Sequence, residues 1–200
     1  RLVSHASDAP TLAAHGVSHA PTISANGERV AFASMASDLA GDVKDHNEGL
    51  DVFVQETASG ETEAVSRRAP EMPSLSPDTT STARALSADG RFLAFESNSP
   101  YLVPGQVDSN GTTDVFLYDR QTKTTVLVSR LGGSATQTGK GPAILPVITP
   151  DGRYVGFASE TSDSFNGGNG YDWDLFLFDR ITGTSGLVTL EDILEEIVGE

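Results

Sequence analysis

Short apolar runs alternate with polar turns along the whole chain, and one order of features occurs three times. Each repeat has a polar turn that ends in Asn-Gly or Asp-Gly, followed by a short apolar run that begins with arginine. The turns lie at 24–27, 87–90 and 149–152, and the apolar runs lie at 29–34, 91–97 and 153–159. Because the turns are 63 and 62 residues apart, the pattern indicates a repeating structural unit.

The second half of each repeat adds two more apolar runs after a long polar loop. They lie at 51–54, 114–117 and 174–177, and then at 63–66, 126–129 and 186–189. Another run precedes each turn, near Ile23, Leu86 and Ile148. An Asn-Gly or Asp-Gly pair between apolar runs favours a tight hairpin, because both residues tolerate positive φ. The pattern therefore predicts four short strands in every repeat.

Four-stranded units that repeat along a chain are typical of β-propeller blades. We predict an all-β fold, a β-propeller of three four-stranded antiparallel blades, with repeats at about 5–66, 67–129 and 130–189. Residues 1–4 match the last run of a repeat, so we expect them to form a strand that completes another blade. A β-sandwich is the alternative, but it does not explain the common register of the repeats. A closed ring takes about four to eight blades, so the chain is either part of a larger ring or half of a six-bladed homodimer.

Two motifs of the second repeat point to a known family. Ser-x-Asp-Gly-Arg-x-x-x-Phe-x-Ser at 87–97 and Asp-Val-Phe-x-Tyr-Asp-Arg-x-Thr at 114–122 resemble the TolB-like β-propeller repeat. The resemblance covers roughly residues 1–189, although the first repeat has Asn26 in place of aspartate. It implies a propeller like those of periplasmic partner-binding domains, of the substrate gates of prolyl-oligopeptidase-type peptidases, and of secreted proteins.

The chain changes character after Thr189. Apolar residues at helical spacing predict an amphipathic helix at 190–200, formed by Leu190, Ile193, Leu194, Ile197 and Val198. The last 18 residues, 183–200, also resemble the C-terminal end of a CBS domain of hemolysin-like, CorC-type proteins. In that family the residues equivalent to Thr189 and Asp192 contact the ribose of an adenine nucleotide. Since no other part of a CBS fold is found, we expect a terminal helix that packs on a blade or a partner, or the seam of a fusion.

The composition excludes several classes of protein. The chain has 13 Lys and Arg against 28 Asp and Glu, and its net charge of −15 argues against binding nucleic acid. Its apolar runs are far shorter than the roughly 20 residues that span a bilayer. The absence of cysteine rules out disulfides, Cys-zinc sites and thiol chemistry. With the TolB-like resemblance, this composition suits the periplasm or the cell exterior.

The long loops of the first two repeats carry the candidate metal ligands. Oxygen-bearing side chains stand at positions 1, 3 and 7 of both loops: Asp45, Asn47 and Asp51, and Asp108, Asn110 and Asp114. This spacing resembles that of Ca²⁺ loops, although neither loop has the glutamate that ends an EF-hand. Alternatively, Asp and Asn close the loop by hydrogen bonds to nearby backbone.

The chain carries no recognisable catalytic constellation, and no Gly-x-Ser-x-Gly elbow occurs. We therefore expect a non-enzymatic module that binds a protein or peptide partner, with no catalytic residue and no organic cofactor. Two alternatives stay open. The chain is the propeller part of a secreted hydrolase, either a peptidase or a carbohydrate-active enzyme, or it is a surface protein stabilised by Ca²⁺.

Overall fold

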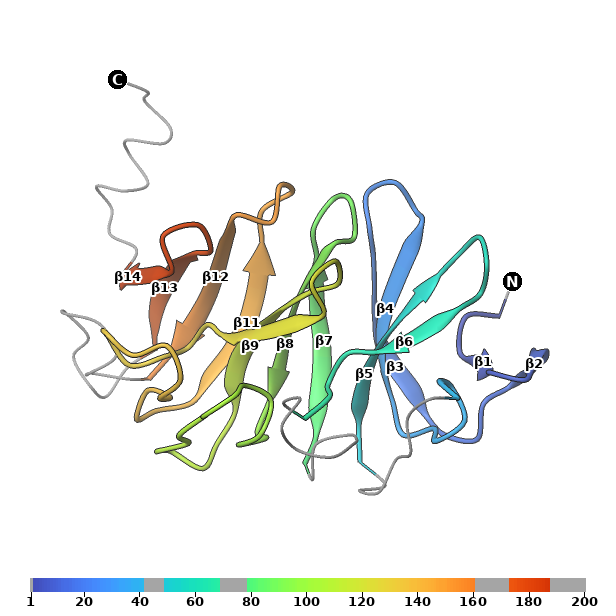
Figure 1. Ribbon diagram of the computed structural model, residues 1–200, viewed down its shortest axis with the longest axis horizontal. Coiled ribbons are helices and arrows are strands. Elements are labelled where there is room, and N and C mark those ends of the chain that lie inside the picture. Colours follow the sequence, from blue (N-terminus) through green and yellow to red (C-terminus); the bar gives the residue numbers. More distant parts are fainter. Residues whose placement is uncertain (1, 42–48, 69–78, 161–172, 188–200) are drawn as a thin grey trace.

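The computed structural model describes residues 2–41, 49–68, 79–160 and 173–187 (Figure 1). Within these ranges, twelve strands form three four-stranded antiparallel sheets that stand side by side. Sheet one contains β3 (Ser18–Ile23), β4 (Arg29–Ser34), β5 (Asp51–Glu56) and β6 (Thr62–Ala64). Sheet two contains β7 (Ser81–Leu86), β8 (Phe92–Ser97), β9 (Asp114–Asp119) and β10 (Thr124–Leu127). Sheet three contains β11 (Ala143–Ile148), β12 (Tyr154–Ser159), β13 (Asp174–Asp179) and β14 (Thr184–Leu187).

The predicted all-β fold of three four-stranded antiparallel blades is confirmed, and each sheet lies within one of the repeats. Strands follow one another in sequence order across every sheet. The first strands pack together, since β7 lies beside both β3 and β11, whereas β6, β10 and β14 form the opposite edges. No helix within the described ranges is long and apolar enough to cross a membrane. The expected helix at 190–200, with Thr189 and Asp192, lies outside the described residues.

A hydroxyl group organises each of the three hairpin turns between the first two strands. It accepts a hydrogen bond of 2.9–3.0 Å from the backbone N–H five residues later, in the pairs Ser24–Arg29, Ser87–Phe92 and Thr149–Tyr154. It also donates to the side-chain oxygen two residues later, in Asn26, Asp89 or Asp151. The glycines that follow have φ values of 70°, 68° and 71°, which glycine adopts without strain. The turn chemistry therefore explains the Asn-Gly and Asp-Gly pairs.

The same hydrogen bond sets the register of the next strand and corrects one prediction. The sequence pattern groups Arg29 with Arg91 and Arg153 at the start of the apolar runs. In the structure this grouping is wrong, because Arg29 takes the place of Phe92 and Tyr154, which bond to the same turn hydroxyl. Glu28 therefore occupies the position of Arg91 and Arg153.

The sheets pack face to face, and the same two kinds of face meet at each contact. Each sheet has a pair of stacked phenylalanines on one face, with ring centroids 5.6–5.9 Å apart: Phe32 and Phe53, Phe95 and Phe116, and Phe157 and Phe176. The other face carries valine or leucine. Val52 and Val54 of sheet one pack in one buried cluster with Phe95 and Phe116, and Val115 and Leu117 of sheet two pack with the phenylalanines of sheet three. Aliphatic side chains of one sheet thus meet aromatic side chains of the next.

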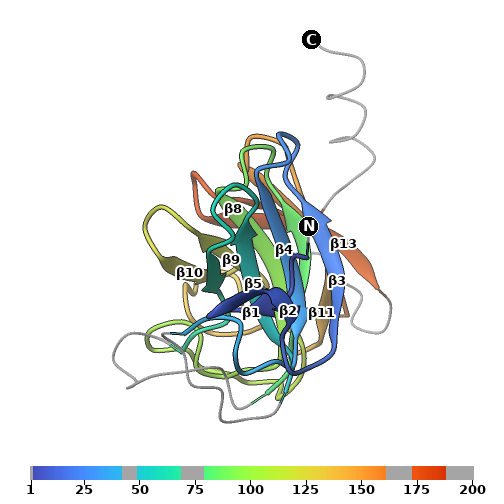
Figure 2. The same cartoon turned by 90° about the vertical axis from the view of Figure 1, so that its right-hand side faces the viewer.

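The N-terminal segment covers the aromatic face of sheet one (Figure 2). Its two-stranded ribbon consists of β1 (His5–Ala6) and β2 (Ala9–Ala13), and Val3 and Ala14 pack against the cluster around Phe32 and Phe53. The prediction that residues 1–4 form a strand is wrong for residues 2–4. The N–H of His5 donates to the carbonyl of Val3, which bends the chain there. That these residues complete another blade stays a prediction.

Candidate functional site

A groove of about 900 Å³ lies between the outer edges of sheets one and two. Strand β6 with Val65, Arg67 and Arg68 forms one side, and β10 with Lys123 lies opposite. An adjoining hollow of about 410 Å³ shares Glu56, Arg120 and Lys123 with it. The groove therefore lies at the seam of two blades and is continuous with the polar contacts that join them.

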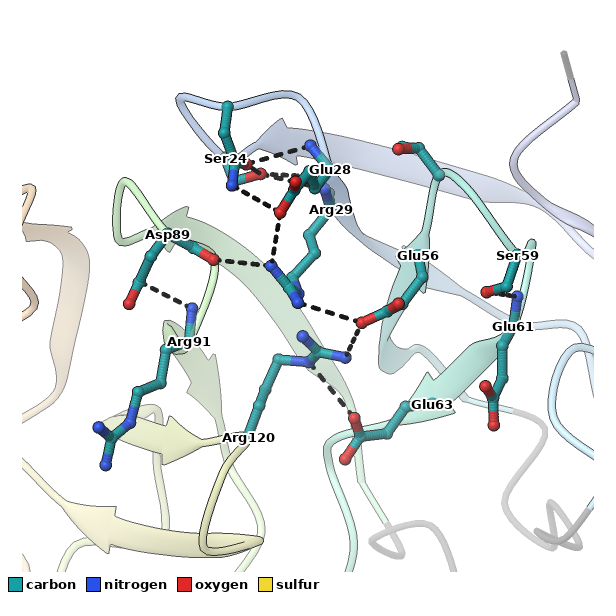
Figure 3. Close-up of polar contacts among 12 residues, drawn as sticks. Ser24, Glu28, Arg29, Glu56, Ser59, Glu61, Glu63, Asp89, Arg91 and Arg120 are labelled. Atoms are coloured by element: carbon teal, nitrogen blue, oxygen red, sulfur yellow. Dashed lines mark hydrogen bonds and ion pairs between the residues drawn. The ribbon is translucent and has the colours of Figure 1, made fainter.

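A chain of alternating charges crosses this seam (Figure 3). The Oε1 atom of Glu56 lies 3.3 Å from a guanidinium nitrogen of Arg29 and 3.4 Å from one of Arg120. Glu63 continues the chain, with Oε2 3.3 Å from Nε of Arg120 and Oε1 2.7 Å from Nζ of Lys123. Arg29 also donates to the backbone carbonyl of Asp89 in the turn of sheet two, at 2.8 Å. Ion pairs and hydrogen bonds thus tie the first sheet to the second.

The register of repeat one explains why this seam is ionic. At the seam of sheets two and three, the guanidinium of Arg180 lies 4.2 Å from the centroid of the Phe92 ring. At the first seam Arg120 holds the place of Arg180, but Arg29 stands where Phe92 would be. Two guanidinium groups then face each other, and the carboxylate of Glu56 between them offsets their repulsion. A cation–π contact in one seam is thereby replaced by an ion network in the other.

Tyr118 forms part of the floor of the groove and holds Glu63 in place. Its hydroxyl donates a 2.6 Å hydrogen bond to Oε1 of Glu63. Burial raises the pKa of the Tyr118 phenol, and the hydrogen bond and charge of Glu63 raise it further. Tyr118 is therefore a neutral hydrogen-bond donor under ordinary conditions. The sequence prediction missed this network. Its signals are Arg29, where the other repeats have an aromatic residue, and Glu63, where they have Val126 and Gly186.

The structure describes the predicted calcium ligands of the second loop, but only one of the three in the first loop. Asp45 and Asn47 lie outside the described residues, so the loop of repeat one is untested. Asp51, the third predicted ligand there, is buried, and its Oδ1 accepts a 2.9 Å hydrogen bond from the hydroxyl of Ser66. Asp114 occupies the same position in sheet two and accepts an equal bond from Ser129. This aspartate–serine contact is a repeated structural feature of the blades.

The structure brings the three predicted ligands of repeat two together. Oδ1 of Asp108 accepts the backbone N–H groups of Asn110 and Gly111, at 3.0 and 2.8 Å. Nδ2 of Asn110 donates to Oδ1 of Asp114 at 3.4 Å and to two backbone carbonyls. These are the local hydrogen bonds of the alternative interpretation, and Asn110 turns its nitrogen rather than its oxygen toward Asp114.

Burial raises the pKa of the Asp114 carboxyl to about 7, and the negative charge of Asp108 also raises it. The hydrogen bonds from Ser129 and Asn110 lower the pKa, but by less. In the part of the chain that the structure describes, no three histidine, aspartate or glutamate side chains are grouped as metal ligands. The donor set as arranged does not fit a metal ion, and calcium binding stays a prediction.

Sheet three has an apolar face that no other described sheet covers. Leu175 and Leu177 of β13 are 62% and 39% exposed, and the nearby Val147 of β11 is 63% exposed. Their equivalents in β9, Val115 and Leu117, are buried against the next sheet. The aliphatic face that sheets one and two each bury is thus open in sheet three.

Comparisons with known proteins agree with the fold. No family model matches the chain, and no curated protein matches it in sequence. Dipeptidyl peptidase 4 of Porphyromonas gingivalis is similar in structure, with a TM-score of 0.51 and 15% identity over 84% of this chain and 25% of that one. TolB of Acinetobacter baumannii has a TM-score of 0.48 and 15% identity over 90% of this chain and 34% of its own. The β-propeller domain of the trilobed protease of Pyrococcus furiosus has a TM-score of 0.48 and 12% identity over 87% of this chain and 41% of that one.

The three sheets and these similarities define the class: the chain has a β-propeller fold. The similar structures include TolB proteins. At such identities the likeness concerns the fold alone. The chain spans 34% of the Acinetobacter protein and 25% of the peptidase, so their activities and partners are not transferred to it.

Proposed function

We propose that this chain is a non-enzymatic β-propeller module that binds a protein partner through the open apolar face of sheet three. The observation that carries the proposal is the exposure of Leu175 and Leu177 at positions that are buried in the other sheets, with the exposed Val147 beside them. Trp173, two residues before Leu175, is also exposed, at 45%. Contiguous apolar patches of this kind mark protein interaction sites.

In the other sheets the equivalent aliphatic face is buried against a neighbouring sheet, so we expect this face to bind an apolar surface. Burying a valine or leucine side chain contributes about 1.5–3 kcal/mol, so this face has a substantial driving force for association. For the isolated chain, the available partner of this chemistry is a second copy. The net charge of −15 on each copy opposes the contact, so added salt should strengthen it.

Two geometries of such a dimer are distinct. A closed ring of six sheets would place sheet three of one copy on the aromatic face of sheet one of the other, where Val3 and Ala14 already pack. A contact between two copies of sheet three leaves the N-terminal segment in place. It also has the two-fold symmetry that is commonest among homo-oligomers. We therefore favour the second geometry.

The test is the solution mass of the chain, measured by sedimentation equilibrium over a range of concentrations and salt. We expect twice the chain mass of 21.0 kDa, and a return to one chain mass in the double variant Leu175→Ser, Leu177→Ser. The control is Ile181→Ser, since Ile181 is 64% exposed but lies in a turn. A monomer at every concentration, or equal loss of the dimer in both variants, would contradict the proposal.

A cysteine placed at residue 175 distinguishes the two geometries, because the natural chain has none. In a contact between two copies of sheet three, Leu175→Cys should oxidise to a disulfide-linked dimer without any second cysteine. A dimer that forms but does not cross-link through this variant would favour the closed six-bladed ring.

We extend the proposal to a location in the periplasm or outside the cell, which the TolB-like resemblance implies. The propeller part of a secreted hydrolase stays an alternative from the sequence. Assays on peptide and glycoside substrates test it, and sustained turnover by the purified chain would contradict the non-enzymatic assignment.

A further inference from the structure

The groove between β6 and β10 is a second surface, separate from the open face of sheet three. We propose that it binds an extended peptide segment that carries acidic side chains. The inference deepens the proposed function by naming a second ligand, and it rests on different residues. Its test can therefore fail without affecting the test of sheet three.

The strands that border the groove suit an extended ligand. β6 and β10 are each the last strand of their sheet, so each has one edge that no other described strand pairs with. An added peptide strand uses such an edge for main-chain hydrogen bonds, and neighbouring side chains supply the specificity. The volume of about 900 Å³ is within the range of about 300–1,000 Å³ for ligand pockets. Leu102 and Pro104 add apolar surface to its lining.

The charge of the groove selects for acidic side chains. Among the described residues that line it, four are Lys or Arg and three are acids, so cations outnumber acids by one there in a chain of net charge −15. Two of those acids, Glu56 and Glu63, already pair with Arg120, and Glu63 also pairs with Lys123. The rest of the molecule repels an acidic peptide, so the groove is where its binding is most favourable.

The cations of the groove are held in position before any ligand arrives. Arg67 donates through Nε to the carbonyl of Ala64 at 2.8 Å, and the guanidinium of Arg68 lies 5.2 Å from the Tyr101 ring centroid. Arg120 is fixed by Glu56 and Glu63. Ordering these side chains on binding therefore costs little entropy, which favours affinity.

The test is fluorescence anisotropy with a short labelled peptide in which valine and glutamate alternate. A matched peptide with lysine in place of glutamate is the control ligand. We expect the glutamate peptide to bind and Lys123→Glu or Arg68→Glu to weaken it at least about tenfold. Lys140→Glu makes the same charge change on an exposed residue outside the groove, and we expect it to leave binding within about twofold.

Thermal melts of each variant separate loss of the groove from loss of the fold. Lys123 pairs with Glu63 of the ion network, whereas Arg68 lies over the Tyr101 ring, so Arg68→Glu keeps the test meaningful if Lys123→Glu destabilises the seam. Equal binding of both peptides, no binding of the glutamate peptide, or equal weakening by Lys140→Glu would overturn the proposal. The Leu175→Ser, Leu177→Ser variant should retain full peptide binding, which keeps the two proposals distinguishable.

Discussion

The buried carboxyl group of Asp114 should make folding stability depend on pH in an unusual direction. Its pKa is about 7 in the folded chain, against 3.8 for an ordinary aspartate. Between these values the folded state keeps a proton that the unfolded state releases. The free energy of unfolding should therefore fall as the pH rises from about 4 to about 7, and then level off. With about 1.4 kcal/mol for each unit of pKa difference, the total loss is on the order of 4 kcal/mol.

The variant Asp114→Asn isolates this effect. Its amide oxygen can accept the hydrogen bonds from Ser129 and Asn110, as Oδ1 of the carboxylate does, but the group never ionises. At pH 8 we expect the variant to be more stable than the natural chain by as much as about 4 kcal/mol, and at pH 4 to be about equal to it. Urea unfolding followed by circular dichroism at both pH values gives the two differences.

Asp108→Asn is the second variant of this series. The charge of Asp108 raises the pKa of Asp114, so removing that charge should reduce the pH dependence without abolishing it. The reasoning is refuted if the stability difference between Asp114→Asn and the natural chain is the same at pH 4 and pH 8. It is also refuted if the variant is the less stable protein at pH 8.

Two further predictions concern the turns and the metal. Gly27 and Gly152 occupy the same turn position at φ 70° and 71°, but a Cβ at Gly27 would meet nothing within 4 Å, while one at Gly152 would overlap the Phe92 ring. Gly27→Ala should cost about 1 kcal/mol from backbone strain, and Gly152→Ala clearly more, so equal melting temperatures would contradict the packing described. If Asp108 and Asp114 bind Ca²⁺, EGTA should lower the melting temperature at pH 8 in the natural chain but not in Asp114→Asn. An unchanged midpoint after confirmed metal removal would count against the site.

The fold could be predicted because its signals are local and occur three times. A turn hydroxyl, an Asn or Asp, and a glycine at fixed spacing build each hairpin, as Ser87, Asp89 and Gly90 do. Alternation of aliphatic and aromatic residues in the third strands sets which face meets which neighbour. A fold built from such short-range patterns needs little information from residues distant in the sequence.

The ion network could not be predicted, because it joins residues far apart in the sequence. Arg29 meets Asp89 and Arg120 only after two sheets have packed. Its register also differs by one residue from the alignment of arginines in the sequence, since the hydrogen bond to Ser24 sets the strand. The bend at Val3 likewise depends on contacts with sheet one rather than on the strand-like pattern of residues 1–4.

Because the two faces of each sheet differ, the two ends of the row of sheets are chemically different. Each sheet has phenylalanines on one face and valine or leucine on the other, so a row must end in one face of each kind. The aromatic end at Phe53 is covered by the N-terminal segment, whereas no other described sheet covers the aliphatic end at Leu175. Arg29, which replaces the aromatic residue of the repeat, lines the hollow that adjoins the groove. Both candidate surfaces therefore lie next to departures from the repeat, one at the end of the row of described sheets and one beside the ionic seam, while the regular positions build the scaffold.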